Sequence, residues 1–285
     1  MHELKRVVVV GAGTMGSQIA LQAALSGRHD VTLVDTVPGQ LERARAQNKK
    51  LLDRSVEKGR LTKDKADQTL AGISETSDLT EAAPNADLVI EAVVENYDAK
   101  RDVFEALGEH AMKDAILASN SSTIAISRLA EVTGRPEKCC NMHFFHPVTV
   151  MQLCEVVRGP KTSDDTVAAA MEFVKSIDRT PVLLQKEIWG FIVNRILFAA
   201  SEEAMRLLEG GYATAEDIDT AVQKGLNWPM GPFHLLDFSG LDVFYGAMQD
   251  RHRLGEGPEA PQVLRRLVDE GHLGRKSGKG FFEYG

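Results

Sequence analysis

The first residues whose spacing suggests chemistry are three glycines near the N-terminus. Gly11, Gly13 and Gly16 form the pattern Gly-x-Gly-x-x-Gly directly after a run of valines, residues 7–10. In dinucleotide-binding folds such glycines allow a tight turn, a close approach of the backbone to a pyrophosphate, and close helix–strand packing. Asp35 ends the next apolar run, where its carboxylate would bind an adenosine ribose and repel a 2′-phosphate. Glycines at this spacing also occur by chance, but the strand, the helix and Asp35 around them favour a site for NAD.

His143 is the residue best suited to proton transfer. It ends a predicted strand, on the side where open α/β sheets bind ligands, and the ordinary pKa of a histidine suits a general base near neutrality. Such a base needs a partner that fixes its tautomer, and Glu155 lies at the neighbouring predicted strand. A base that takes the hydroxyl proton, beside a nicotinamide that takes the hydride from the same carbon, would allow oxidation of a secondary alcohol. A lone histidine at a strand end can equally be structural, so these residues alone leave its role open.

A hydroxyl-rich loop supplies further candidates. Ser119, Ser121 and Ser122 follow a predicted strand at 116–118 and precede a predicted helix that begins near Thr123. One hydroxyl would suffice to cap that helix, so the others are available to hydrogen-bond a substrate. Both interpretations can hold together.

These residues must be positioned by alternating strands and helices. The valine run is typical of a strand buried on both faces of a parallel sheet, and a helix from the glycine turn to Gly27 leads to a strand at 31–34. Further strands are predicted at 87–90, 116–118, 139–143, 154–157 and 180–184, with helices at 96–112, 123–133 and 164–177. The alternation predicts an α/β fold with a Rossmann-type, doubly wound, mostly parallel sheet.

Two segments depart from this alternation. Residues 38–71 are charged and helical in pattern, broken at Lys58-Gly59 with Thr62 as a plausible N-cap, which predicts an inserted helical hairpin. After about residue 187 only helices are expected, around 196–208, from 214, near 233–253 and at 260–270. We therefore expect an NAD-binding domain at 1–186 and an all-helical domain at 187–285.

Composition narrows the class of protein. The 285 residues are 43% hydrophobic and 26% charged, as in a globular enzyme, and the net charge of −8 argues against a nucleic-acid partner. Three cysteines suit neither a disulfide framework nor metal-ligand spacing. The N-terminus lacks a signal-peptide pattern, and no apolar run approaches the roughly 18 residues that span a bilayer. We expect a cytoplasmic protein with no metal and no membrane partner.

Seven short runs point further, to one family. They are Gly11-Ala12-Gly13-Thr14-Met15-Gly16, Glu91-Ala92-Val93-Val94-Glu95-Asn96, Ser119-Asn120-Ser121-Ser122, Met142-His143-Phe144-Phe145, Gly190-Phe191-Ile192-Val193-Asn194-Arg195, Pro229-Met230-Gly231-Pro232 and Gly274-Arg275-Lys276-Ser277-Gly278-Lys279-Gly280-Phe281. Together they resemble the short-chain L-3-hydroxyacyl-CoA dehydrogenase family, which includes the bacterial 3-hydroxybutyryl-CoA dehydrogenases. The resemblance extends from residue 5 to Tyr284.

The resemblance implies a role for each matching residue. His143 and Glu155 match the family's catalytic dyad, and Ser122 and Asn194 match the residues that hydrogen-bond the C3 oxygen of the substrate, in a cleft between domains. Lys58 matches a lysine near the CoA phosphates, although a solvated helix face would also explain it. The implied NAD contacts are Gly11, Gly13, Thr14, Met15, Gly16, Asp35, Glu95, Lys100, Ser122, His146 and Lys276. Glu95 could instead be a helix N-terminal carboxylate, and Lys100 an exposed lysine.

Three positions depart from the family pattern. His146 stands where relatives usually have an asparagine that contacts NAD, Trp189 replaces a proline, and Trp228 replaces a histidine. None of these changes affects the predicted dyad. The added aromatic bulk leaves the identity of the acyl chain open.

We therefore expect NAD-dependent oxidation of a 3-hydroxyacyl-CoA, or the reverse reduction, with an acyl-CoA as substrate. One alternative is a dehydrogenase of a CoA-free 3-hydroxy acid, similar to relatives that act on L-gulonate or carnitine. Another is a non-catalytic NAD-binding or structural protein, similar to the lens crystallins of this superfamily. The many apolar positions of the small helical domain, together with the resemblance, predict a homodimer.

Overall fold

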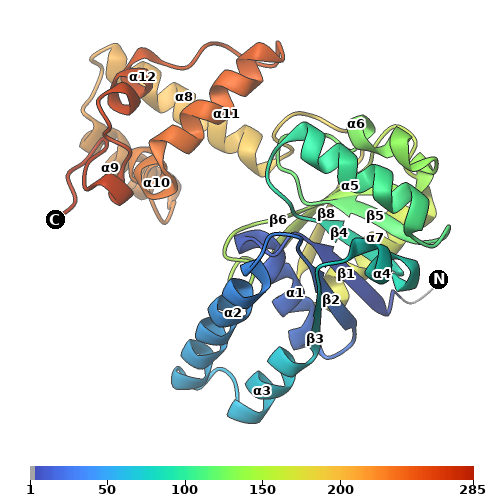
Figure 1. The fold of residues 1–285 in the computed structure, drawn as a ribbon. Helices are drawn as coiled ribbons and strands as arrows, with labels where there is room; N and C mark the ends of the chain where they lie inside the picture. Colours follow the sequence, from blue (N-terminus) through green and yellow to red (C-terminus); the bar gives the residue numbers. More distant parts are fainter. Residues whose placement is uncertain (1–3) are drawn as a thin grey trace. The chain divides into compact units, whose positions relative to one another are not determined.

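The computed structural model describes residues 4–285, which fold as two compact units (Figure 1). The first ends at Phe191 and the second runs from Ile192 to Gly285. The first unit combines strands and helices, whereas the second contains helices and short turns. This matches the expected α/β fold followed by an all-helical segment.

The first unit is built on an eight-stranded sheet in the order β3-β2-β1-β4-β5-β6-β7-β8. Its strands are β1 (Arg6–Val10), β2 (Asp30–Val34), β3 (Ile73–Thr76), β4 (Leu88–Glu91), β5 (Ile116–Ser119), β6 (Cys139–Phe144), β7 (Leu153–Val157) and β8 (Thr180–Leu184). Neighbouring strands are parallel except β6 and β7, which are antiparallel. The expected doubly wound, mostly parallel sheet is confirmed.

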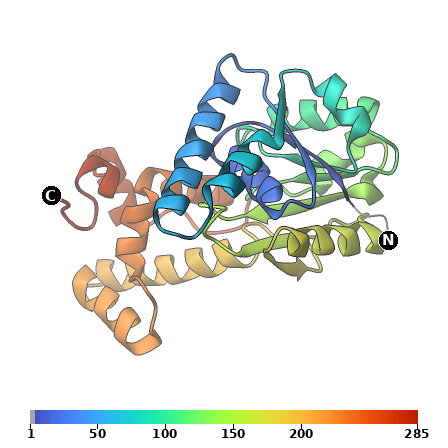
Figure 2. The same cartoon turned by 90° about the horizontal axis from the view of Figure 1, so that it is seen from below.

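Helices cover both faces of this sheet, and the valines of β1 show why (Figure 2). Val7 and Val9 pack into the core under α1 (Thr14–Ser26) and α7 (Asp164–Ser176), while Val8 and Val10 pack on the opposite face under α5 (Tyr97–His110). Successive residues of a strand point to opposite faces, so a strand with helices on both sides must be apolar at every position.

The segment between β2 and β3 is the expected helical hairpin, made of α2 (Gln40–Glu57) and α3 (Lys63–Ala71). The Thr62 side chain accepts a hydrogen bond from the backbone N–H of Lys65, which confirms the predicted N-cap. The strand β3 and the short helix α4 (Leu79–Ala82) that follow were not predicted. Only Ile73 of β3 is buried, so this edge strand lacks an apolar pattern.

One predicted helix of this unit is wrong in extent. Residues 123–126 are not helical, and only α6 (Ser127–Ala130), with a 3₁₀ turn at Glu131–Thr133, forms within the expected 123–133. The backbone N–H groups of Thr123, Ile124 and Ile126 are bound by the side chains of Glu95, Ser121 and Asn141. Donors that are already bound to side chains do not drive a helical turn.

The second unit contains α8 (Val193–Glu209), α9 (Ala215–Leu226), α10 (Pro232–Ser239), α11 (Leu241–Arg253) and α12 (Gln262–Asp269). The expected helix near 233–253 is divided at Gly240, whose φ of 98° interrupts the helix. Asp237 holds the C-terminal segment to α10, because its carboxylate accepts hydrogen bonds from the backbone N–H groups of Phe281 and Phe282. Within residues 4–285, no helix has the length and apolar character to cross a bilayer.

Candidate active site

The glycine turn between β1 and α1 needs glycine at two positions. Gly11 has a φ of 102°, and a Cβ there would lie 2.6 Å from the carbonyl oxygen of Ala92. A Cβ at Gly16 would lie 1.8 Å from the carbonyl oxygen of Gly11. At Gly13 a Cβ would meet no atom within 4 Å, so this glycine borders open space at the start of α1. Gly13 caps α1 without a side-chain hydrogen bond, which leaves N–H groups of the first turn, where Thr14 and Met15 lie, for an anion.

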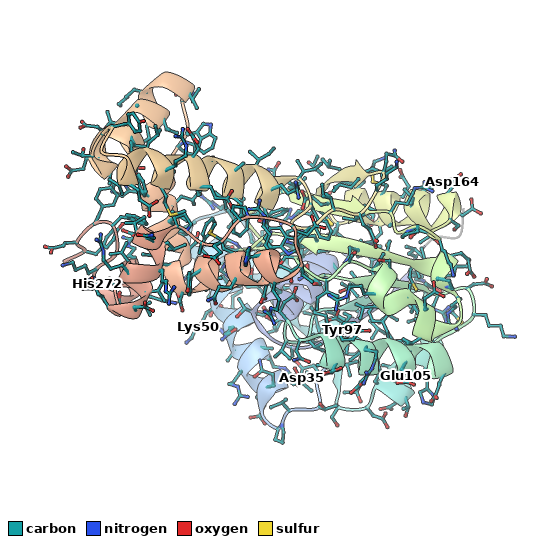
Figure 3. The ribbon with its side chains drawn as sticks, turned by 90° about the horizontal axis from the view of Figure 1, so that it is seen from above. Asp35, Lys50, Tyr97, Glu105, Asp164 and His272 are labelled. Atoms are coloured by element: carbon teal, nitrogen blue, oxygen red, sulfur yellow. The ribbon has the colours of Figure 1, made fainter. Side chains whose placement is uncertain are left out.

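A pocket of about 490 Å³ lies beside this turn. Gly11, Gly13 and Asp35 line it together with apolar side chains that include Val37, Leu79 and Val94. Asp35, labelled in Figure 3, follows β2. Its two carboxylate oxygens accept hydrogen bonds from the backbone N–H groups of Ala12 and Val37. The apolar slot suits an adenine, the carboxylate suits a ribose, and the uncapped helix N-terminus suits a pyrophosphate. These residues therefore fit an NAD molecule.

His143 and Glu155 lie opposite each other on the antiparallel strands β6 and β7. His143 Nδ1 is 2.8 Å from Glu155 Oε2. Glu155 is fully buried and His143 is 6% exposed, with the rings of Phe145 and Phe191 centred 4.5 and 5.5 Å from the imidazole ring. A carboxylate on Nδ1 fixes the tautomer with Nε2 as the acceptor, which is the arrangement of a general base.

The loop at 119–124 carries Ser122, and the neighbours of this residue are all held in place. Asn120 Oδ1 accepts a hydrogen bond from the backbone N–H of Phe144, next to His143. Ser121 and Thr123 donate their hydroxyls to Glu95. Among the residues that the structure describes, none hydrogen-bonds the Ser122 hydroxyl. The hydrogen bonds of its neighbours therefore fix the backbone around Ser122.

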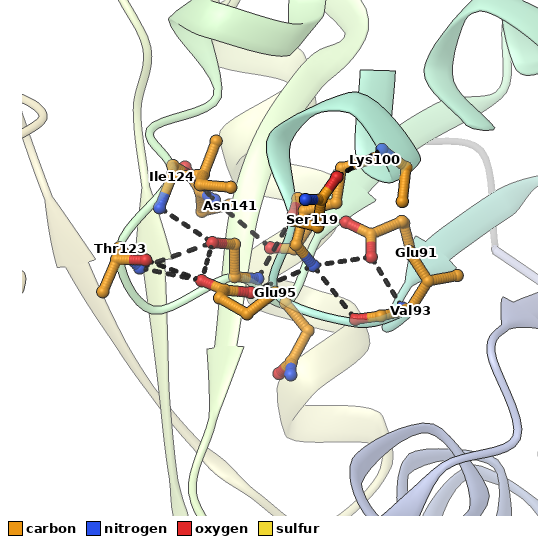
Figure 4. Close-up of polar contacts among 12 residues, drawn as sticks. Glu91, Val93, Glu95, Lys100, Ser119, Thr123, Ile124 and Asn141 are labelled. Atoms are coloured by element: carbon orange, nitrogen blue, oxygen red, sulfur yellow. Dashed lines mark hydrogen bonds and ion pairs between the residues drawn. The ribbon is translucent and has the colours of Figure 1, made fainter. Parts of the chain in front are cut away.

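Glu95 and Lys100 form a network that extends beneath this loop (Figure 4). Lys100 Nζ lies 2.7 Å from Glu91 Oε1 and 3.1 Å from Glu95 Oε2. Lys100 is only 1% exposed, so the alternative of an exposed lysine is wrong. Burial by itself raises the pKa of Glu95, but the Lys100 charge and the hydroxyls of Ser121 and Thr123 outweigh it and lower that pKa below its ordinary value.

Glu91 begins one of the seven runs quoted above, but the sequence suggested no role for it. Its carboxylate is fully buried and accepts hydrogen bonds from Lys100, Ser119 and the backbone N–H of Val93. A signal was available, because an ionisable residue that ends an otherwise apolar strand rarely stays buried without a partner.

The remaining predicted residues lie outside the strands that carry the dyad. His146 is exposed on the segment after β6, and Lys58 is exposed at the C-terminal end of α2. Asn194, in the first turn of α8, and Lys276, 2.5 Å from Asp242 Oδ1, belong to the second unit. Ser122, His143 and Glu155 belong to the first.

The cysteines offer no chemistry. Cys139, Cys140 and Cys154 are free and buried within the sheet. Burial raises the pKa of the Cys139 thiol to about 11, and it also raises that of Cys154 well above its ordinary value. These thiols stay protonated near neutral pH, so they are packing residues.

Comparisons with known proteins cover the whole described chain. The NAD binding domain of 3-hydroxyacyl-CoA dehydrogenase matches residues 6–188, and the C-terminal domain of the same family matches residues 190–284. A probable 3-hydroxybutyryl-CoA dehydrogenase of Deinococcus radiodurans is 43% identical over 278 residues, covering 97% of this chain and 99% of that protein.

Solved structures agree with this result. The crystal structure of (S)-3-hydroxybutyryl-CoA dehydrogenase from Ralstonia eutropha is 37% identical, with a TM-score of 0.94 over 99% of this chain and all of that one. A diketoreductase, described as acting on dicarbonyl compounds, is 35% identical, with a TM-score of 0.89 over the full length of both chains.

Proposed function

The chain belongs to the 3-hydroxyacyl-CoA dehydrogenase family, and from this membership we propose that it oxidises an (S)-3-hydroxyacyl-CoA, such as 3-hydroxybutyryl-CoA, with NAD, or catalyses the reverse reduction. The observation that carries the proposal is the contact of 2.8 Å between His143 Nδ1 and Glu155 Oε2. It provides a positioned base in a chain whose glycine turn and Asp35 suit NAD. We assign cofactor binding to residues 1–186 and substrate and dimer contacts to residues 187–285.

The dyad performs the proton transfer. His143 Nε2 accepts the proton of the substrate's C3 hydroxyl as the C3–O bond gains double-bond character. Glu155 holds the imidazole in the tautomer that leaves Nε2 free of a proton, and it stabilises the imidazolium that forms. Bound NAD would supply the hydride acceptor for C3. In the reverse direction the imidazolium returns its proton to the ketone oxygen.

The other proposed roles follow the family pattern. Ser122 and Asn194 donate hydrogen bonds to the C3 oxygen, and Lys58 binds near the CoA phosphates. The proposed cofactor contacts are Gly11, Gly13, Thr14, Met15, Gly16, Asp35, Glu95, Lys100, Ser122, His146 and Lys276. The role of Ser122 is supported by its hydroxyl, which no described residue hydrogen-bonds. The role of Asp35 is supported by its position in the pocket beside the glycine turn.

Initial rates with NAD across a panel of substrates test the proposal. The panel holds 3-hydroxyacyl-CoA thioesters of increasing length beside free 3-hydroxybutyrate, carnitine and gulonate. We expect turnover of the thioesters, and a kcat/KM that falls strongly when CoA is removed, since remote binding energy supports catalysis at the reacting carbon. NAD binding without turnover of any of these compounds would favour a non-catalytic protein.

A second candidate function keeps the dyad and NAD but uses a substrate without CoA. The similarity of the whole chain to a diketoreductase favours keeping it open. Trp189 and Trp228 also depart from the family pattern and add aromatic bulk. The same panel separates the two candidates, because this one requires a free acid or ketone to be turned over at least as well as its thioester.

Assembly and compartment belong to the proposal as well. We expect a homodimer formed through the helical unit, where large apolar side chains are exposed, with Phe238 at 61% and Val243 at 63%. We also expect a reducing, cytoplasmic compartment, which suits three free, buried cysteines.

A further inference from the structure

Glu91 links the 119–124 loop to the segment between β4 and α5, and none of the roles above uses it. It is fully buried at the end of β4, directly beside Ser119 at the end of β5. One carboxylate oxygen, Oε1, accepts hydrogen bonds from Lys100 Nζ and the backbone N–H of Val93, both at 2.7 Å. The other, Oε2, accepts one from Ser119 Oγ at 2.7 Å. A buried carboxylate with three donors is fixed in position.

Two connections lead from this carboxylate to the serine loop (Figure 4). The first is direct, because the Ser119 hydroxyl that it binds also accepts the backbone N–H of Ser121. The second runs through Lys100 to Glu95, which binds the hydroxyls of Ser121 and Thr123. Ser122 lies between the two residues that Glu95 holds.

The charges explain why Glu91 controls the second connection. Lys100 has three N–H donors, and three oxygens surround its Nζ, those of Glu91 and Glu95 and the backbone carbonyl of Val93. A buried ammonium group needs opposite charge close by. Without the Glu91 charge, Glu95 would be the remaining carboxylate on Lys100. It would be drawn toward the ammonium and away from the hydroxyls of the loop.

We propose that Glu91 is a positioning residue, which holds the 119–124 loop through Ser119 and through Lys100 and Glu95, so that the Ser122 hydroxyl meets the C3 oxygen of the substrate. This inference rests on the role proposed above for Ser122. Glu91 itself is fully buried, so it acts on the reaction through its neighbours. Its effect on kcat comes from the position that it gives to the Ser122 hydroxyl.

The test compares Glu91→Gln with Glu105→Gln, which removes the same charge from an exposed position on α5. We expect Glu91→Gln to lower kcat about 10- to 100-fold, the size of a misplacement near 1 Å. kcat is measured at saturating NAD, and the Kd for NAD is titrated separately, because Lys100 and Glu95 of this network are also proposed cofactor contacts. Glu105→Gln should match the wild type. A kcat for Glu91→Gln within twofold of wild type would overturn the proposal.

A double-mutant cycle of Glu91→Gln with Ser122→Ala tests whether Glu91 acts through Ser122. If Glu91 acts through Ser122, the two substitutions are not additive, and Ser122→Ala costs much less in the Glu91→Gln background than in the wild type. Additive effects would overturn the proposal while leaving the proposed function intact. If Ser122→Ala leaves the kcat of the wild type unchanged, the proposed role of Ser122 fails instead, and this inference with it.

Hydrogen exchange provides a readout besides activity. The backbone N–H groups of Ser121, Thr123 and Ile124 are bound within the network, so peptides covering 119–126 should exchange faster in Glu91→Gln and not in Glu105→Gln. Unchanged exchange in this loop would contradict the proposal. Should Glu91→Gln fail to fold, Glu91→Gln/Lys100→Met removes both buried charges, and the cycle and the exchange experiment are carried out in that background.

Discussion

His143 and Glu155 face each other across the one antiparallel strand pair of the described sheet, with Nδ1 and Oε2 2.8 Å apart. Side chains of directly opposed residues point to the same face of a sheet, so the contact follows from the register of β6 and β7. Neither side chain needs a loop to hold it. This gives the proposed base a fixed orientation before any ligand binds.

Replacing the base should affect turnover far more than cofactor binding. We expect His143→Ala to lower kcat by about 10²- to 10⁴-fold, the usual contribution of a general base, and to leave the Kd for NAD nearly unchanged. Glu155→Gln should cause a smaller loss, because the imidazole remains while its charged partner is gone. Steady-state rates and NAD titration measure both, with the exposed His110→Ala as a control. Near-wild-type turnover of His143→Ala would disprove the dyad.

The cofactor preference should follow from Asp35. Its carboxylate lines the pocket beside the glycine turn and would face the 2′-phosphate of NADP. We expect kcat/KM to favour NAD by a wide margin, and Asp35→Ala to narrow the gap between the two cofactors. Equal values for both cofactors in the wild type would contradict the assignment.

His146 should tune binding without taking part in the reaction. An imidazole can replace the hydrogen bond of the asparagine found in relatives, but it adds volume. We expect His146→Asn to change the KM for NAD by a few-fold and to keep the order of preferred substrates, which the thioester panel measures. A changed order, most clearly in combination with Trp189→Pro, would assign His146 to substrate specificity instead. Loss of all turnover with NAD still bound would make it a participant in the chemistry.

The helical unit should pair two chains. Light scattering at micromolar concentration should give twice the chain mass of 31.2 kDa. Replacing the exposed Phe238 and Val243 with serine removes apolar surface and should shift the equilibrium toward monomer if these residues lie in the interface. A stable species near 31.2 kDa in the wild type would refute the dimer.

The Arg6–Asp87 pair should make stability depend on pH. The hydrogen bond from the Arg6 guanidinium, followed by other contacts, lowers the pKa of Asp87 below its ordinary value. The carboxylate therefore stabilises the fold above its unfolded-state pKa, and this contribution is lost as pH falls through the lower folded-state pKa.

Asp87→Asn should accordingly reduce the free energy of unfolding by about 1 kcal/mol at pH 7, a value discounted for the exposed guanidinium. At pH values below the folded-state pKa of Asp87, the free energies of unfolding of the variant and the wild type should become equal. Urea denaturation across this range measures it, and the exposed Asp114→Asn provides the control. If the difference in the free energy of unfolding stays constant with pH, the charge of Asp87 is not its cause.

Features with a local cause could be read from the sequence. The valines of β1 and the N-cap at Thr62 are examples, because each depends on residues close by in the chain. The Glu155 partner was suggested by two consecutive predicted strands, although the roles of both dyad residues remain predictions. The edge strand β3 was not predicted because Ile73 is its one buried residue, which leaves no apolar pattern. Its position is set by pairing with β2.

The surroundings of Lys100 show the limit of such reasoning. Its position in the sequence suggests an exposed helical residue, and its burial depends on Glu91, which ends a different element. The helix expected from Thr123 was wrong for a related reason, since Glu95 and Asn141 bind backbone N–H groups from distant parts of the chain. Contacts between elements that are far apart in sequence decide both cases.

The antiparallel pairing of β6 and β7 has a consequence for how this enzyme family can change. The ladder sets His143 opposite Glu155, and the connection at 145–152 between the two strands carries His146. The exposed part of that connection, around His146, could therefore change and redirect specificity while the proton-transfer pair stays intact, whereas Phe145 packs on the imidazole and Val148 is buried. A one-residue slip within the ladder itself would instead turn every side chain of β7 to the opposite face. Substitutions are therefore less restricted at the exposed positions of this connection than in the two strands.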